Sequence, residues 1–339
     1  MYVHILVFKE FLKLMDSIRL ISKLLETSII YLKKSSHYIT GYFLYMESKN
    51  KIKQLYSNVC PKCKSGLLKT HHGYSCHECD SRYDILNNIP ILVDLNSLPK
   101  QLENQIQYFE KEKISTRKKY SVSPWQKNYV KRFLDNFELI EDKKILDCGT
   151  GSGYMAIELA KLGAKVVACD LTLNSLIRLK EVTKNLKSKH KIEFVCCTAD
   201  ELPFRSSYFD YFISNAVLEH IPREKKAIEE INRVTSSKAG MMVTVPIMFK
   251  YIFPLLRPIN WIHDKKIGHL RRYDLRSIIS KFKNWKIINI YYTGHLSKVV
   301  KTLSNIIIKI FDEESIEIQD STQTSIPSNS SNIICFLKK

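Results

Sequence analysis

The chain has 339 residues, of which 45% are hydrophobic and 26% charged, and its formal net charge is +19. This composition is that of a globular protein, and the length allows one large domain beside a smaller one. The basic excess favours a polyanion such as nucleic acid, or anionic lipid headgroups, as partner, although scattered lysines also occur on ordinary solvated surfaces. No apolar run approaches the ~20 residues of a membrane span, so we expect no transmembrane segment.

The cellular compartment follows from the first residues and the cysteines. The start, "MYVHILVFKEF", lacks a basic n-region and a cleavage site, so we expect no signal peptide. Nine cysteines, including two CxxC pairs, without a secretory signal favour a reducing compartment and metal over disulfides. We therefore expect a cytoplasmic protein, with peripheral membrane contact as an open alternative.

Four regions follow one another along the chain. Apolar side chains at steps of three and four predict an amphipathic helix over residues 8–32, which would pack on the main domain, a partner or a bilayer surface. We assign residues 1–55 to this helical extension, 56–96 to a cysteine-rich module, 97–120 to a linker containing a helix, and 121–339 to the main domain.

The cysteine-rich module contains "CPKCKSGLLKTHHGYSCHEC", in which two CxxC pairs stand twelve residues apart. Two turns that each present a pair of thiolates are typical of a tetrahedral zinc site, formed here by Cys60, Cys63, Cys76 and Cys79. A redox-active dithiol is the alternative. Four cysteine ligands leave no open coordination position, so we expect this zinc to be structural.

The main domain alternates strand-like and helical stretches. Near-continuous apolar strands separated by helices predict a doubly wound, mostly parallel α/β sheet covered on both faces. The strand-like runs are residues 143–149, 164–170, 191–199, 208–215, 240–246, 285–294 and 332–339.

The first of these strands leads into a glycine turn, "ILDCGTGSGYMAIELA", with Gly149, Gly151 and Gly153 inside five residues. A strand, a glycine turn and a helix hold a ligand against backbone amides. Asp170, at the end of the next strand, is placed to accept hydrogen bonds from a ribose diol. A plain tight turn with an acidic helix cap is the alternative.

The glycine spacing separates two kinds of nucleotide-type cofactor. A dinucleotide fingerprint needs a third glycine where this chain has Tyr154. The pattern "ILDCGTGSG", a strand, an acid and then GxGxG, resembles motif I of the class I S-adenosylmethionine-dependent methyltransferases. The later stretch "TADELPFRSSYFDYFISNAVLEHI" also resembles that family. The resemblance covers about residues 121–339, comes nearest to the small-molecule branch with quinone and sterol methyltransferases, and implies a Rossmann-like sheet of seven strands.

The resemblance also implies a set of site residues. Those expected to bind S-adenosylmethionine are Asp147, Gly149, Gly151, Gly153, Asp170, Leu171, Asp200, Glu201 and Asn215. The segment from Asn215 to His220 would line the methyl-transfer pocket. His220 is the candidate general base, although neutral structural histidines are common.

A basic stretch after the fifth strand is the candidate acceptor site. "GHLRRYD" resembles a stretch that recurs in the same branch, which implies that His269, Arg271, Arg272 and Tyr273 face the acceptor. The arginine pair would clamp a phosphate or carboxylate, unless it precedes a helix on a solvated surface. An apolar shelf next to a basic stripe would suit a lipid-linked acceptor at a membrane face.

Three functions stay open at this point. The first is methyl transfer to a small-molecule or lipid-linked acceptor. The second is RNA methylation, which the net charge favours; the segment "SRYDILNNIPILVD" also resembles zinc-ribbon proteins that partner and activate methyltransferases. Against it, "SNAVLEH" stands where base-methylating enzymes carry an Asn/Asp-Pro-Pro-aromatic stretch. The third is binding of S-adenosylmethionine or RNA without catalysis.

Overall fold

The computed structural model describes residues 58–71, 73–112, 120–137, 139–184, 192–294 and 327–339. By its internal contacts the chain separates into residues 1–54 and 55–339, and all described residues belong to the second unit. The amphipathic helix predicted for residues 8–32 lies outside the described residues.

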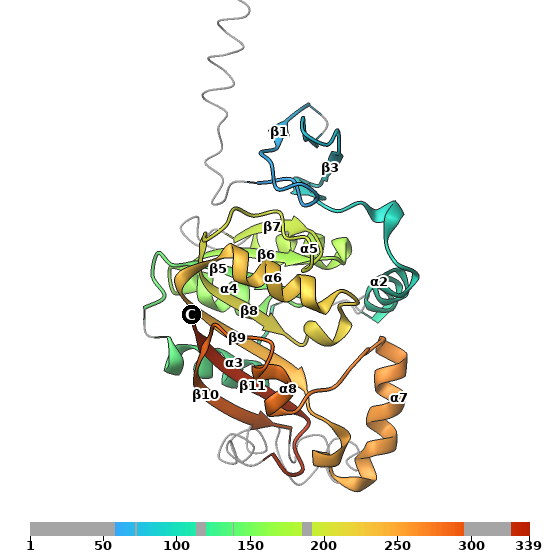
Figure 1. Cartoon of the computed structure of the whole chain (residues 1–339), viewed down its shortest axis with the longest axis vertical. Helices are drawn as coiled ribbons and strands as arrows, with labels where there is room; N and C mark the ends of the chain where they lie inside the picture. Colours follow the sequence, from blue (N-terminus) through green and yellow to red (C-terminus); the bar gives the residue numbers. More distant parts are fainter. Residues whose placement is uncertain (1–57, 72, 113–119, 138, 185–191, 295–326) are drawn as a thin grey trace, which may run out of the picture. The chain divides into compact units, whose positions relative to one another are not determined.

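A seven-stranded sheet forms the centre of this unit (Figure 1). Its order is β10-β11-β9-β8-β5-β6-β7, and neighbours pair in parallel except β11, which is antiparallel to both β9 and β10. The predicted doubly wound, mostly parallel sheet is confirmed. Each of the seven strand-like runs coincides with one strand, except that β9 begins earlier than its run, at Thr235. The strands are β5 (Lys144–Cys148), β6 (Lys165–Asp170), β7 (Ile192–Cys196), β8 (Phe209–Asn215), β9 (Thr235–Pro246), β10 (Lys286–Thr293) and β11 (Asn332–Lys338).

Both faces of the sheet are buried, because successive apolar side chains of a strand point to opposite faces. Ile145 belongs to a core with α3, α4 and α5, whereas Leu146 belongs to a core with α6 and α8. Within the described ranges, no helix has the length and apolar composition that crossing a bilayer requires. The helices are α2 (Lys100–Glu112), α3 (Pro124–Asn136), α4 (Tyr154–Lys161), α5 (Leu173–Thr183), α6 (Glu224–Val234), α7 (Arg257–Ile267) and α8 (Leu275–Ile279), with 3-10 turns η1 (Leu95–Ser97), η2 (Leu218–His220), η3 (Phe249–Tyr251) and η4 (Pro254–Leu256).

The cysteine-rich module is a four-stranded antiparallel sheet that packs directly on the main domain. Its strands are β1 (Leu68–Lys69), β2 (Gly73–Ser75), β3 (Arg82–Leu86) and β4 (Ile89–Pro90). The amide of Val59 donates to the carbonyl of Pro203, and the amide of Leu92 donates to the carbonyl of Cys196 at the end of β7. Leu92 is fully buried and shares one core with residues of the main sheet.

An ion pair adds a polar anchor between the module and α6. Lys64 Nζ lies 2.6 Å from Glu230 Oε2, and it also donates to the carbonyl of Leu202. Burial alone would raise the pKa of Glu230, but hydrogen bonds from Arg233 and Lys64 outweigh it and hold the pKa below its usual value. Breaking the Lys64–Glu230 pair removes one charge-assisted hydrogen bond from a mostly buried carboxylate, which Arg233 continues to hold.

We predict that Lys64→Met lowers the free energy of unfolding by about 1.5 kcal/mol, the contribution of one hydrogen bond to a charged group, because Arg233 still pairs with Glu230; the measurement is urea denaturation at pH 7. Lys131→Met is the matched control: the Lys131–Asp135 pair has the same 2.6 Å separation, but its side chains are 71% and 48% exposed, against 29% and 8% for Lys64 and Glu230. The control should change stability little, because exposed pairs contribute little. The folded pKa of Glu230 lies below its usual 4.5, so the Lys64 effect should fade as the pH falls through that folded value. Equal effects of the two substitutions would contradict the anchor.

Candidate active site and metal centre

A cavity of about 260 Å³ opens at the carboxyl ends of β5, β6, β7 and β8. The chain runs outward from β5 in one direction and returns to β8 on its other side, which creates the crevice where doubly wound sheets bind ligands. The wall of the cavity consists of residues that closely follow each strand, and of Leu102, Gln105, Ile106 and Phe109 from α2. The helix predicted inside the linker therefore lines the cavity.

The three glycines of the turn serve different purposes. All three have positive φ, at 70° for Gly149, 53° for Gly151 and 74° for Gly153, a region that other residues rarely adopt. A Cβ on Gly149 would lie 2.4 Å from Val217, and a Cβ on Gly153 would lie 2.2 Å from Leu179. Gly149 and Gly151 line the cavity, whereas Gly153 is outside its lining and makes room for α5.

Asp170 connects the glycine turn to the loop after β6. Its Oδ2 accepts the Gly151 amide at 2.9 Å and its Oδ1 accepts the Thr172 amide at 2.8 Å. Each carboxylate oxygen has two acceptor sites, so the side chain retains capacity for hydroxyl donors in the cavity that it lines. This arrangement fits a ribose diol.

Asp147 and Asn215 support the turn from beneath. Asp147 is buried and accepts a hydrogen bond from Thr150 at 2.6 Å, and burial raises its pKa to about 6. Asn215 lines the cavity and donates to the Tyr154 hydroxyl at 2.8 Å. The structure thus places Asn215 at the cavity and Asp147 behind it.

The two acidic residues after β7 have different surroundings. Asp200 is buried, lines the cavity and accepts a hydrogen bond from Arg223 at 2.7 Å. Glu201 lies outside the cavity lining and pairs with Arg223 and Lys226. Of the predicted cofactor residues, the structure brings to the cavity Gly149, Gly151, Asp170, Leu171, Asp200 and Asn215.

His220 lines the cavity and follows β8 in the turn η2. Burial, together with the neighbouring His269, lowers the pKa of His220 to about 3. The imidazole is therefore neutral at pH 7 but a weak base, since efficient general bases have pKa values near the working pH. Its role as a base stays a prediction.

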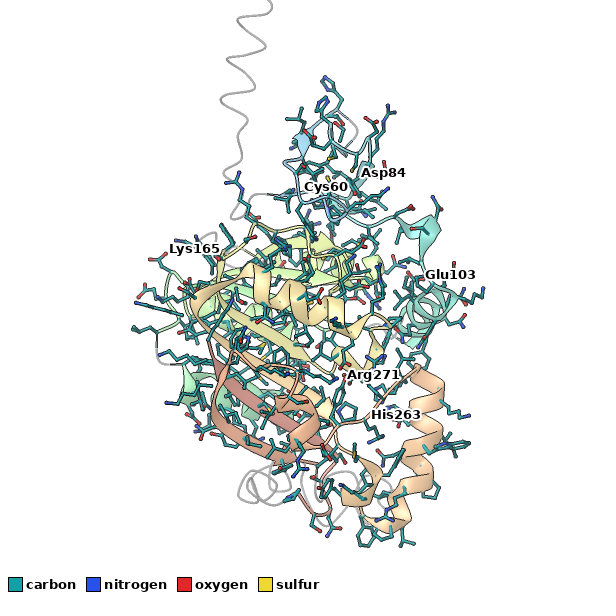
Figure 2. All side chains as sticks on the ribbon, viewed as in Figure 1. Cys60, Asp84, Glu103, Lys165, His263 and Arg271 are labelled. Carbon is teal, nitrogen blue, oxygen red and sulfur yellow. The ribbon has the colours of Figure 1, made fainter. Side chains whose placement is uncertain are left out.

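The four predicted acceptor residues make contacts within the protein and are absent from the cavity lining. Arg272 forms a two-pronged ion pair with Asp264, and His269 Nδ1 lies 2.8 Å from the same carboxylate. Arg271, in the loop between α7 and α8 (Figure 2), donates to the carbonyls of Leu218 and Ile221. The buried Tyr273 donates to Glu224 at 2.6 Å.

Two features of the site were not singled out as functional from the sequence: the cavity-lining face of α2 and the residue Glu219. It stands beside His220 in η2, its side chain is 1% exposed, and neither carboxylate oxygen accepts a hydrogen bond from another described side chain. Burial raises its pKa to about 8. The apolar spacing of Leu102, Ile106 and Phe109 was the available signal for the cavity-lining face of α2.

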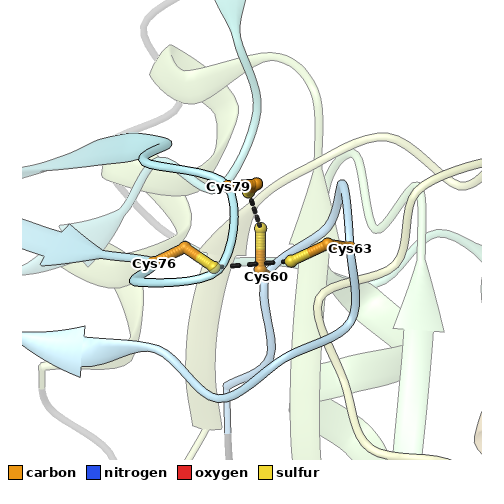
Figure 3. Close-up of side chains that lie close together, drawn as sticks. All are labelled: Cys60, Cys63, Cys76 and Cys79. Carbon is orange, nitrogen blue, oxygen red and sulfur yellow. Dashed lines mark hydrogen bonds between the residues drawn. The ribbon is translucent and has the colours of Figure 1, made fainter.

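The four cysteines of the module converge (Figure 3). Cys60 Sγ lies 3.6 Å from Cys79 Sγ, and Cys63 Sγ lies 3.4 Å from Cys76 Sγ. Zinc–thiolate bonds of about 2.3 Å in a tetrahedron place sulfurs about 3.8 Å apart, so this set fits zinc closely. The predicted ligand set is thus compatible with a zinc ribbon.

Comparison with known proteins agrees with this geometry. Residues 146–243 match the family model described as "Methyltransferase domain". A demethylmenaquinone methyltransferase from Paenarthrobacter aurescens is 31% identical over 37% of this chain and 46% of its own length, and sterol 4-C-methyltransferase strm-1 of Caenorhabditis elegans is 29% identical over 30% of each chain. A solved complex of the Haloferax volcanii Trm112 methyltransferase activator with a methyltransferase matches 71% of this chain and 97% of that chain at 14% identity, with a TM-score of 0.49.

These observations define the class of the main domain. It has a Rossmann-like methyltransferase fold, and residues 146–243 within it match a methyltransferase domain. The chain spans less than half the length of the two curated relatives named above.

We predict that Asp170→Asn largely abolishes the thermal stabilisation of the protein by S-adenosylhomocysteine. Hydrogen bonds to a charged acceptor contribute about 1.5–3 kcal/mol each, so affinity should fall at least ~10-fold. The measurement is the melting temperature at increasing ligand. Asp210→Asn is the control, because Asp210 also accepts a backbone amide, that of Lys144, but at the opposite end of the strands. Undiminished stabilisation of the Asp170 variant would contradict the ribose assignment.

We also predict that Cys63→Ser lowers the zinc content by one ion per chain, measured by elemental analysis of purified protein. A metal that closes a small module contributes directly to its folding, so the melting temperature should fall too. Cys335→Ala, in the buried strand β11, should retain the zinc although it loses core packing. Equal zinc in both variants would rule out the thiolate site.

Proposed function

We propose that this protein transfers a methyl group from S-adenosylmethionine to a small-molecule or lipid-linked acceptor. The observation that carries the proposal is the cavity at the ends of β5–β8, where the carboxylate of Asp170 retains hydrogen-bonding capacity beside the bare backbone of Gly151. The match of this same region to a methyltransferase family supports it. The names of the quinone and sterol relatives favour a small organic acceptor.

The chain's own residues would divide the work as follows. Asp170 would accept the ribose hydroxyls, Asp200 would face the adenine, and the backbone from Gly149 to Gly151 would lie against the rest of the donor. When bound, S-adenosylmethionine supplies a methyl group on a positively charged sulfur, which leaves as a neutral thioether. The protein's main task is then placement of the acceptor, since the leaving group is already activated.

The apolar lining of the cavity supports an apolar acceptor, and we call its α2 part the lid. Leu102, Ile106 and Phe109 of α2 present apolar side chains to the cavity, and Val217 and Ile221 do so from the segment after β8. A mostly apolar wall with a few polar groups is typical of pockets for small organic ligands. An RNA base would need a wider, basic approach to this cavity, and the cations of the "GHLRRYD" stretch are engaged with other groups of the protein.

The surface around α7 favours an acceptor that resides in lipid. The exposed large apolar side chains here are Leu255 in η4 and Ile259, Trp261 and Ile262 in the first half of α7. The basic pair Lys265 and Lys266 follows in its last turn. Apolar side chains next to lysines are characteristic of surfaces that bind the interface of anionic membranes. This arrangement supports a lipid-linked acceptor and peripheral membrane contact.

The test is transfer of label from methyl-labelled S-adenosylmethionine to a fractionated cell lysate. We expect label in the organic-solvent extract, at a rate at least ~10-fold above that of Asp170→Asn. The fractions compared are the organic extract, the aqueous small molecules, the RNA and the protein. Asp210→Asn should retain the wild-type rate.

The outcomes distinguish the candidate functions. Label confined to RNA would replace the proposal with an RNA methyltransferase. Binding of the donor without label in any fraction would support a non-catalytic protein. Label in water-soluble small molecules alone would support methyl transfer and remove the lipid-linked acceptor.

A further inference from the structure

A buried cluster beside the cavity has the composition of a metal site that is separate from the four cysteines. Glu219, His220 and His269 each offer a ligand atom, and these atoms lie within 4.8 Å of one another. Two imidazoles and one carboxylate are a ligand set known for divalent transition metals, with open positions left for other ligands. None of the three contributes to the zinc ribbon.

The polar atoms of this cluster lack the partners that burial requires. Both carboxylate oxygens of Glu219 and Nδ1 of His220 are buried without a hydrogen bond within the described part of the chain. Glu219 Oε1 lies 3.7 Å from His269 Nε2, which is too long for a hydrogen bond. A buried carboxylate without a partner is strongly unfavourable, and a cation between these groups would satisfy all three.

His269 is oriented as a metal-binding histidine. Its Nδ1 is 2.8 Å from Asp264 Oδ1, so Nδ1 donates to this carboxylate and Nε2 faces Glu219 at 3.7 Å. A carboxylate on the far nitrogen fixes the tautomer of metal-ligating histidines and makes them more basic. Arg272 holds Asp264 in turn through two nitrogens.

The backbone already holds the two ligand segments together. The amide of Leu270 donates to the carbonyl of Glu219 at 2.9 Å, and Arg271 donates to the carbonyls of Leu218 and Ile221. Ligands 2.0–2.2 Å from a common ion lie about 3–4 Å apart, so ligand atoms that are now up to 4.8 Å apart would have to approach each other by about 1 Å. His220 lines the cavity, which gives an ion a route inward.

We propose that Glu219, His220 and His269 bind one divalent transition-metal ion at the edge of the cavity, with Asp264 as the positioning residue. Three protein ligands leave coordination positions for an oxygen from the cavity side, such as water or an oxygen of the acceptor. The two nitrogen ligands favour ions such as Zn²⁺ or Fe²⁺ over Mg²⁺ and Ca²⁺, and the carboxylate and open positions also allow the weaker-binding Mn²⁺. The proposal is independent of methyl transfer, because metal binding is measured without donor or acceptor.

The test uses the full chain carrying one equivalent of zinc, which the tighter four-cysteine site takes up, and titrates it with MnCl₂ while free Mn²⁺ is followed by electron paramagnetic resonance. Mn²⁺ is the probe because thiolate ligands prefer zinc, so Mn²⁺ does not displace the zinc from the four cysteines. We expect one saturable Mn²⁺ per chain in the wild type. Glu219→Gln should weaken it at least ~10-fold, and Asp264→Asn should weaken it by ~10–100-fold, as loss of a positioning partner does.

Two further variants keep the result decisive. His220→Ala should also weaken Mn²⁺ binding. It provides a second test of the site if the Glu219 variant does not fold. His71→Gln changes an exposed histidine of the cysteine module and should bind Mn²⁺ as the wild type does. Absence of a saturable Mn²⁺ ion, or equal binding by wild type, Glu219→Gln and His220→Ala, would overturn the proposal.

Discussion

The cavity depends on the carboxylate of Asp170, which holds two loops in one conformation. It accepts the amides of Gly151 and Thr172, while the carbonyl of Cys169 accepts the amides of Gly149 and Thr150. The glycine turn has positive φ angles at alternate residues and no regular backbone ladder, so these bonds replace the missing secondary structure. The carboxylate of Asp170 therefore holds the turn in place and also faces the cavity, so one side chain has both the structural role and the proposed binding role.

Asp264 organises the residues behind the part of the cavity wall that His220 and Ile221 form. This carboxylate collects Arg272 and His269, and the neighbouring Arg271 ties the loop to the carbonyls that flank η2. The arginines of the basic stretch thus hold other parts of the protein in place, and we call this group of contacts the Asp264 scaffold. Glu219 lies inside this scaffold, and neither of its buried carboxylate oxygens has a hydrogen-bond partner among the described residues. This missing partner, next to the imidazoles of His220 and His269, is the physical basis of the metal proposal.

Local patterns were sufficient to predict the strands, the glycine turn and the cysteine cluster. Each depends on residue spacing within a short segment, such as the apolar run before Gly149. Contacts between distant segments were not readable in this way. Arg271 and Arg272 look like free cations in sequence, and only the fold brings them to Leu218 and Asp264. The cavity-lining face of α2 was hidden for the same reason, because the charged residues around its apolar positions resemble a linker.

The path of the chain links the cysteine module to the cavity. The module is fixed to the ends of β7 and α6, and the chain then passes through η1 into α2. Gln105 of α2 donates to the carbonyls of His220 and Gly268, so the lid is joined to both segments of the Asp264 scaffold. The four-cysteine site lies before α2 in the chain and would be structural, because four thiolate ligands leave no coordination position for a substrate. The proposed ligand set of Glu219, His220 and His269 has open positions and lies beside the cavity, where a substrate could reach them.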